Sequence, residues 1–285
     1  MGKFSRSWAL VQQSFAILRS DKELMLFPVL SALSCLLVTA TIVGGGVLAL
    51  VPSITAAGGV RSAGWQVNQS PVFLLALFAV YVANYFVIVF FNVALVGVAN
   101  SRLMGGTWTF RDGIALAWTR KGTILQWALL AATVGVVLRT LEQRMGILGR
   151  IIMRLVGIAW ALACYFVVPV LAFENLTPID AIKRSARLFR DTWGEKVVGG
   201  FSIGLVFLVL ALPGFGLWIL AAILGGTTGM LVGLALMVLY FLLLSVASSA
   251  VQGIFNAALY HYACFKQVPP AFSAEFITSA WTPKT

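Results

Sequence analysis

The chain has 285 residues, of which 60% are hydrophobic and 10% charged, and its mean hydropathy is +0.97. A soluble domain carries about 25% charged residues, so this composition could not cover a water-facing surface and excludes an ordinary soluble protein. The net charge is +11, but the basic residues lie in short segments between long apolar blocks. That pattern favours contact with anionic lipid headgroups on the cytoplasmic face over nucleic acid.

Six apolar blocks approach or exceed the roughly 20 residues that a helix needs to cross a bilayer. The first is too long for a cleaved signal sequence, whose apolar part runs about 7–15 residues, so it is expected to stay as a span. The sequence predicts an all-α, polytopic helical membrane protein of about six transmembrane helices. The predicted spans are Leu26–Val51, Val72–Ala99, Thr123–Leu138, Ile152–Phe173, Val198–Leu224 and Met230–Tyr260.

Lysine and arginine are distributed unequally between the two sides of these spans. Fifteen lie in the first terminus, the second and fourth connections and the tail, and five lie in the first and third connections. The positive-inside bias therefore predicts that both termini are cytoplasmic. Four of the five opposing charges lie in the third connection, Arg139 to Arg154. Apolar residues recur there at helical spacing, which predicts a short helix at the outer interface.

A short amphipathic segment precedes the first, third and fifth spans, and each segment leads into a two-span hairpin. The third segment opens on Thr177, Pro178 and Asp180, which are residues typical of a helix N-terminus. This pattern predicts a single membrane domain, residues 1–266, made of three helix-plus-hairpin repeats, and a short cytoplasmic tail. The repeats are expected at about 1–100, 101–174 and 175–266, and the tail at 267–285.

Three blocks resemble an uncharacterised family of bacterial six-span membrane proteins. They are "SRSWALVQQSFAILRSDKELMLFPVLS", "RDGIALAWTRKGTILQWALLAATVG" and "PVLAFENLTPIDAIKRSARLFRDTWGEKVVG". The third is also distantly similar to the membrane domain of some glycerophosphodiester phosphodiesterases, and the resemblance does not include their catalytic domain. It implies a bacterial inner (cytoplasmic) membrane location and carries over no activity and no catalytic residue.

The sequence offers little for catalysis. His261 is the only histidine, so a histidine-assisted nucleophile or a metal cluster has few ligands to draw on. The three cysteines, Cys35, Cys164 and Cys264, lie inside or at the ends of spans and are expected to be apolar thiols. We expect no catalytic residue, no metal and no cofactor, and predict that the protein is not an enzyme.

Basic residues gather on the amphipathic segment before the fifth span. Lys183, Arg184, Arg187 and Arg190 are predicted to contact anionic headgroups. Glu174, which closes the fourth span, is expected to pair with Arg184 or Arg187; a conformational latch is the alternative.

The sixth span carries one polar face. Ser245, Ser249, Gln252 and Asn256 fall within a sector of about 60°. This face predicts either hydrogen bonding between helices or protomers, or the lining of a path for a neutral or lipid-like solute. The leading hypothesis is a membrane-organising, partner-binding protein that contacts anionic lipid and can form homo-oligomers. The competing hypothesis is a channel or transporter for that solute.

Overall fold

The computed structural model describes residues 14–16, 18–19, 21–56, 71–193 and 201–267, and every element in this part of the chain is a helix. Most of the first amphipathic segment, the first outer loop and the predicted tail lie outside the described residues. The elements are η1 (Lys22–Met25), α2 (Leu26–Ala56), α4 (Pro71–Leu103), α5 (Phe110–Thr119), α6 (Lys121–Arg144), α7 (Ile147–Ala163), α8 (Val167–Phe173), α9 (Pro178–Trp193) and α10 (Phe201–Phe265).

Five helical segments of the described chain have the length and composition to cross a membrane. They are Lys22–Gly46, Leu75–Leu103, Lys121–Arg144, Ile147–Phe173 and Val206–Phe265. The class predicted from sequence, a protein of apolar helices of membrane-spanning length, is therefore confirmed.

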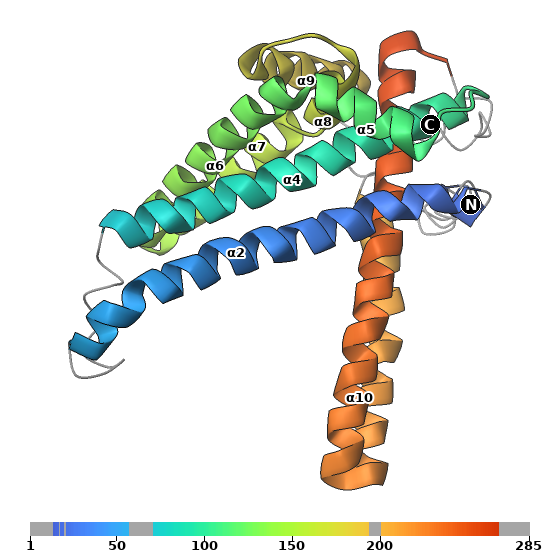
Figure 1. Ribbon diagram of the computed structural model, residues 1–285. Coiled ribbons are helices and arrows are strands. Elements are labelled where there is room, and N and C mark those ends of the chain that lie inside the picture. Colours follow the sequence, from blue (N-terminus) through green and yellow to red (C-terminus); the bar gives the residue numbers. More distant parts are fainter. Residues whose placement is uncertain (1–13, 17, 20, 57–70, 194–200, 268–285) are drawn as a thin grey trace.

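Helix α4 lies at the centre of the fold and contacts α2, α5, α6, α8 and α10. Every residue of its segment Val93–Ala99 is buried. Close approach is possible because small residues face each other: a Cβ built on Gly113 of α5 would lie 2.9 Å from the carbonyl oxygen of Ala94. In Figure 1, α2 (blue) and α4 (teal) run side by side, and α5 lies at the end of α4.

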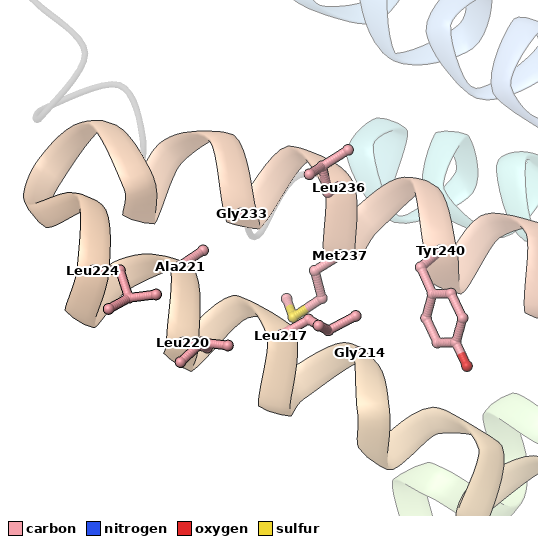
Figure 2. A pocket seen from close by; sticks show the side chains of 9 residues that line it. All are labelled: Gly214, Leu217, Leu220, Ala221, Leu224, Gly233, Leu236, Met237 and Tyr240. Carbon is pink, nitrogen blue, oxygen red and sulfur yellow. The ribbon is translucent and has the colours of Figure 1, made fainter.

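Helix α10 folds back on itself at Gly226, whose φ of 56° lies in the left-handed region that favours glycine. The two arms pack against each other. The indole N–H of Trp218 donates to the carbonyl of Met230 at 3.3 Å, and the Tyr240 hydroxyl donates to the carbonyl of Leu210. Between the arms lies an apolar cleft of about 470 Å³. Figure 2 shows its lining side chains, which come from both arms.

The hairpin does not share the axis of the other long helices. Figure 1 shows α10 (orange) crossing α2 and α4 steeply, with its tip pointing away from them. Helices that cross in this way cannot all stand along the normal of one flat bilayer. The prediction of six spans is therefore not confirmed: five segments qualify, and the last contains both arms of α10.

The third connection differs from its prediction. Helix α6 continues to Arg144 and α7 begins at Ile147, so Met145 and Gly146 alone form the turn. The expected short interfacial helix is wrong, because the intervening residues extend the two long helices. Arg154 on α7 pairs with Glu142 on α6 at 3.2 Å across the hairpin. At 1.5 Å per residue, the turn lies about 36 Å from the start of α6.

The fourth predicted span, Ile152–Phe173, is interrupted. Residues 164–166 form a turn between α7 and α8, in which the backbone N–H groups of Cys164 and Tyr165 still donate to carbonyls of α7. The backbone N–H of Phe166 donates to the Ser185 hydroxyl of α9 at 2.9 Å, and both groups are buried. A break in an apolar helix is tolerated where a neighbouring hydroxyl satisfies the freed backbone group, so α9 is joined directly to this break.

The contact of α10 with α4 gives a first prediction. A Cβ on Gly253 would collide with the side chain of Leu95, which is fully buried. We expect Gly253→Ala to destabilise the protein by about 1–3 kcal/mol, as overpacking typically does. The measurement is the thermal unfolding midpoint in detergent.

The control is Gly216→Ala on the first arm, where a Cβ would meet nothing within 4 Å. It should stay within about 1 kcal/mol of the unsubstituted protein. Equal midpoints for the two variants would contradict the close packing at Gly253.

Candidate functional site

Helix α9 begins with a capped first turn, as the sequence predicted. The Thr177 hydroxyl donates to Asp180 Oδ2 at 2.7 Å, and the backbone N–H of Asp180 donates to Thr177 Oγ1 at 3.3 Å. The hydrogen bond from Thr177 lowers the pKa of Asp180, and the charge of Lys183 lowers it further. Asp180 therefore stays ionised well below neutral pH. Its negative charge in the first turn interacts favourably with the positive end of the helix dipole.

The helix has two distinct faces. Its buried face includes Ala181, Ser185 and Leu188, which pack into the helical core. Lys183, Arg187 and Arg190 recur at helical spacing on the exposed face. Arg184, which was predicted to share their role, is half-buried and turned toward the core. The structure thus brings together three of the four predicted headgroup residues and separates the fourth.

Carboxylates accompany the exposed basic residues of α9. Lys183 Nζ lies 3.6 Å from Asp180, and Arg190 Nε lies 3.4 Å from Asp191. Solvent-exposed pairs of this kind contribute about 0–1 kcal/mol, so both cations remain available to other anions. The Arg187 guanidinium donates to the backbone carbonyl of Lys183, at 3.4 Å.

Glu174, at the end of α8, lies within a polar cluster. Arg184 Nε lies 3.0 Å and 3.1 Å from its two carboxylate oxygens, and the Tyr260 hydroxyl donates to Oε1 at 2.8 Å. Arg184 Nη2 also lies 3.8 Å from Cys264 Sγ. The cluster joins α8, α9 and the second arm of α10. Glu174 was predicted to pair with Arg184 or Arg187, and the structure pairs it with Arg184; its role as a latch stays a prediction.

Sequence reasoning missed three residues that connect α9 and the end of α8 to their neighbours. Tyr260 and Ser185 were not singled out, although both lie where polar groups of a span end meet the amphipathic helix. Arg120 was likewise missed: its guanidinium donates to Asn175 Oδ1 at 2.6 Å and ties the start of α6 to the α8–α9 connection. For Tyr260 and Arg120 the available signal was a polar residue next to a predicted span end, whereas Ser185 lies in the middle of α9.

The predicted polar face of the sixth span is divided. Ser245 and Ser249 line a cleft of about 300 Å³ between α2, α4 and α10. Gln252 is exposed and donates to the Ser248 hydroxyl at 2.9 Å. Asn256 is half-buried, and its buried Oδ1 has no hydrogen-bond partner among the described residues. The four residues therefore do not form one continuous path.

The remaining reactive groups are scattered. His261 is buried, and its ring centroid lies 4.8 Å from that of Phe265. Cys35, Cys164 and Cys264 are free thiols and half-buried. Within the described ranges no three His, Cys, Asp or Glu side chains are grouped so that they could hold a metal ion.

Together these features define a helical protein whose long helices have the length and composition to cross a membrane, with a basic amphipathic helix fixed to one end. A family model described as a family of unknown function, DUF6159, matches residues 71–268, more than half of the chain. The chain belongs to this family. No curated protein and no solved structure matches it. The expectation of an uncharacterised family is thus confirmed, and the bacterial source and the similarity to phosphodiesterase membrane domains stay predictions.

The Glu174 cluster gives a second prediction. Glu174→Gln removes the charge that Arg184 and Tyr260 share at a half-buried site. We expect a loss of about 1–2 kcal/mol, at the lower end for hydrogen bonds to charged groups because both partners are partly exposed. A double-mutant cycle with Arg184→Gln, followed by chemical unfolding in detergent, measures the coupling.

Glu142→Gln is the matched control. It breaks the more exposed pair with Arg154, and we expect it to cost less than about 1 kcal/mol. If the two Glu→Gln variants lose equal stability, the cluster does not fix α9.

Proposed function

We propose that this protein is a non-enzymatic, multi-pass protein of the bacterial inner membrane that organises anionic lipid at the cytoplasmic face. The exposed face of α9, with Lys183, Arg187 and Arg190, would be its contact with phosphate headgroups. Each basic residue near an anionic surface contributes on the order of 1 kcal/mol. Nucleic acid is not among the proposed partners; a second copy of the chain or another membrane protein is.

The observation that carries this proposal is the attachment of α9. Ser185 binds the broken helix at Phe166, and Arg184 binds Glu174. Both anchors lie on the inner side of α9, so its exposed cations keep fixed positions at the end of the membrane helices. Exposed Arg111, Lys121 and Lys266 also belong to the termini of helices next to this end. A fixed array of cations suits a headgroup layer better than a flexible basic tail would.

We further propose six spans in three repeats, with both termini cytoplasmic. The order α5 then α6–α7–α8, followed by α9 then α10, supports the second and third repeats. The six spans would then share one bilayer at different tilts, with the α10 hairpin crossing α4 as Figure 1 shows. The exposed apolar side chains along both arms of α10 support contact with hydrocarbon.

A second candidate function is the passage of a neutral or lipid-like solute. The polar lining at Ser245 and Ser249 supports it. The separation of Gln252 and Asn256 from that cleft argues against a continuous route, so lipid organisation is preferred.

Removing the exposed charge of α9 tests the main proposal. We expect the triple variant Lys183→Gln, Arg187→Gln, Arg190→Gln to retain about tenfold less phosphatidylglycerol, because a loss of about 1.4 kcal/mol, half of the roughly 3 kcal/mol that three basic residues can contribute, is a factor of ten. The measurement is the ratio of co-purified phosphatidylglycerol to phosphatidylethanolamine by mass spectrometry.

The control removes the same charge from the other end of the α6–α7 hairpin: Arg139→Gln, Arg144→Gln, Arg150→Gln. We expect it to change the lipid ratio less than threefold, since these arginines do not lie on the anchored helix (a factor of three is about 0.65 kcal/mol). Equal losses in the two triple variants would refute the assignment to α9.

Topology is tested separately. Gly146→Cys, in the turn between α6 and α7, should react with a membrane-impermeant maleimide in intact cells. Lys183→Cys should react only after the cells are opened, because the positive-inside rule places α9 in the cytoplasm. The opposite labelling pattern would overturn the orientation.

A further inference from the structure

The cleft between α2, α4 and α10 has the features of a ligand site. Its volume of about 300 Å³ is at the lower end of the range for small-molecule pockets, about 300–1,000 Å³. It opens to the surface at Ala32, Leu242 and Ser245, which are exposed. Phe27, Phe91 and Leu95 form the apolar wall at its inner side. Helices α2 and α4 and the distant α10 thus border one amphipathic space.

Polar side chains face this space from all three helices. Ser31 and Cys35 come from α2, Asn92 from α4, and Ser245 and Ser249 from α10. Within the part of the chain that the structure describes, the side chains of Asn92, Ser245 and Ser249 make no hydrogen bond to protein. Polar groups in a hydrocarbon environment cost several kcal/mol when unsatisfied. A ligand that carries its own donors and acceptors would satisfy them.

The charge and depth of the cleft define the chemistry of that ligand. None of its thirteen lining residues is charged. Ser31 and Cys35 lie five and nine residues beyond the start of α2 at Leu26, which is about 8–14 Å along the helix. Half of the hydrocarbon core is about 15 Å thick. A charged phosphate at that depth would be removed from water and would have no counter-charge nearby, which is strongly unfavourable. An uncharged hydroxyl or ester can occupy the same place.

We propose that this cleft binds an uncharged amphiphile with a hydrocarbon chain and a hydroxyl or ester headgroup, the class to which diacylglycerol belongs. The headgroup hydrogen-bonds to Asn92 and Ser249, and the acyl chain leaves the cleft at Ala32 and Leu242 toward the bilayer. The site is independent of the proposed contact of α9 with anionic lipid, since the cleft and α9 have no residue in common.

Cys35 provides a direct readout, because it is one of the residues that line the cleft. The full-length protein in detergent micelles is alkylated with N-ethylmaleimide, and peptide mass spectrometry follows Cys35 and Cys264 in the same sample. Cys264 belongs to the Glu174 cluster and serves as the internal control. The probes are dioctanoylglycerol, dioctanoyl phosphatidylglycerol and glycerol.

We expect dioctanoylglycerol to slow alkylation of Cys35 roughly threefold at about twice its Kd, by mass action, and to leave Cys264 unchanged. Phosphatidylglycerol and glycerol should have no such effect. The double variant Asn92→Leu, Ser249→Ala should lose the protection, whereas Ser34→Ala, on α2 outside the cleft, should keep it. If the double variant does not fold, Ser245→Ala, Ser249→Ala decides the same question.

Equal protection by phosphatidylglycerol would overturn the proposal, as would an absence of protection by dioctanoylglycerol or its persistence in the double variant. The triple glutamine variant of α9 should retain protection of Cys35 while it loses anionic lipid. Protection of Cys35 tests the ligand site in the cleft, and retention of anionic lipid tests the proposed function of α9, so either proposal can fail without the other.

Discussion

The rest of the structure depends on the buried segment Val93–Ala99 of α4. Helices pack in an apolar solvent through shape and close backbone approach, because lipid is as apolar as their own side chains. This segment supplies small, apolar surface on all sides, and α2, α5, α6, α8 and α10 contact the helix that contains it. Glycines on the partners, Gly113 on α5 and Gly253 on α10, allow the approach.

Polar interactions in this protein are concentrated where helices end or break. Ser185 satisfies the interruption between α7 and α8, and Asp21 pairs with Arg102 at 2.6 Å between the start of η1 and the end of α4. Within the apolar parts of the helices, the side-chain amide of Asn84 on α4 donates to the hydroxyl of Thr39 on α2 at 2.9 Å. Such bonds are worth about 0.6–2 kcal/mol in membranes. They fix the register of helices whose association is driven by packing.

The two proposed sites make different demands on the same fold. The exposed face of α9 needs a rigid position and open access to headgroups, which its anchors at Arg184 and Ser185 supply from the opposite face. The cleft needs separation from water and unpaired neutral polar groups, which the crossing of α10 over α2 and α4 supplies.

The sequence by itself determined the helical membrane class, because uninterrupted apolar blocks have no other stable solution in lipid. It also predicted the cap of α9, which depends on neighbouring residues in the sequence, and a basic partner on α9 for Glu174, although it left Arg184 and Arg187 open. The tertiary structure alone decided three further points: the inward turn of Arg184, the short turn at Met145 and Gly146, and the cleft that gathers Asn92 with Ser245 and Ser249. Periodicity shows which face of one helix is polar. It carries no information on the neighbour that face meets, because that depends on how separate helices cross.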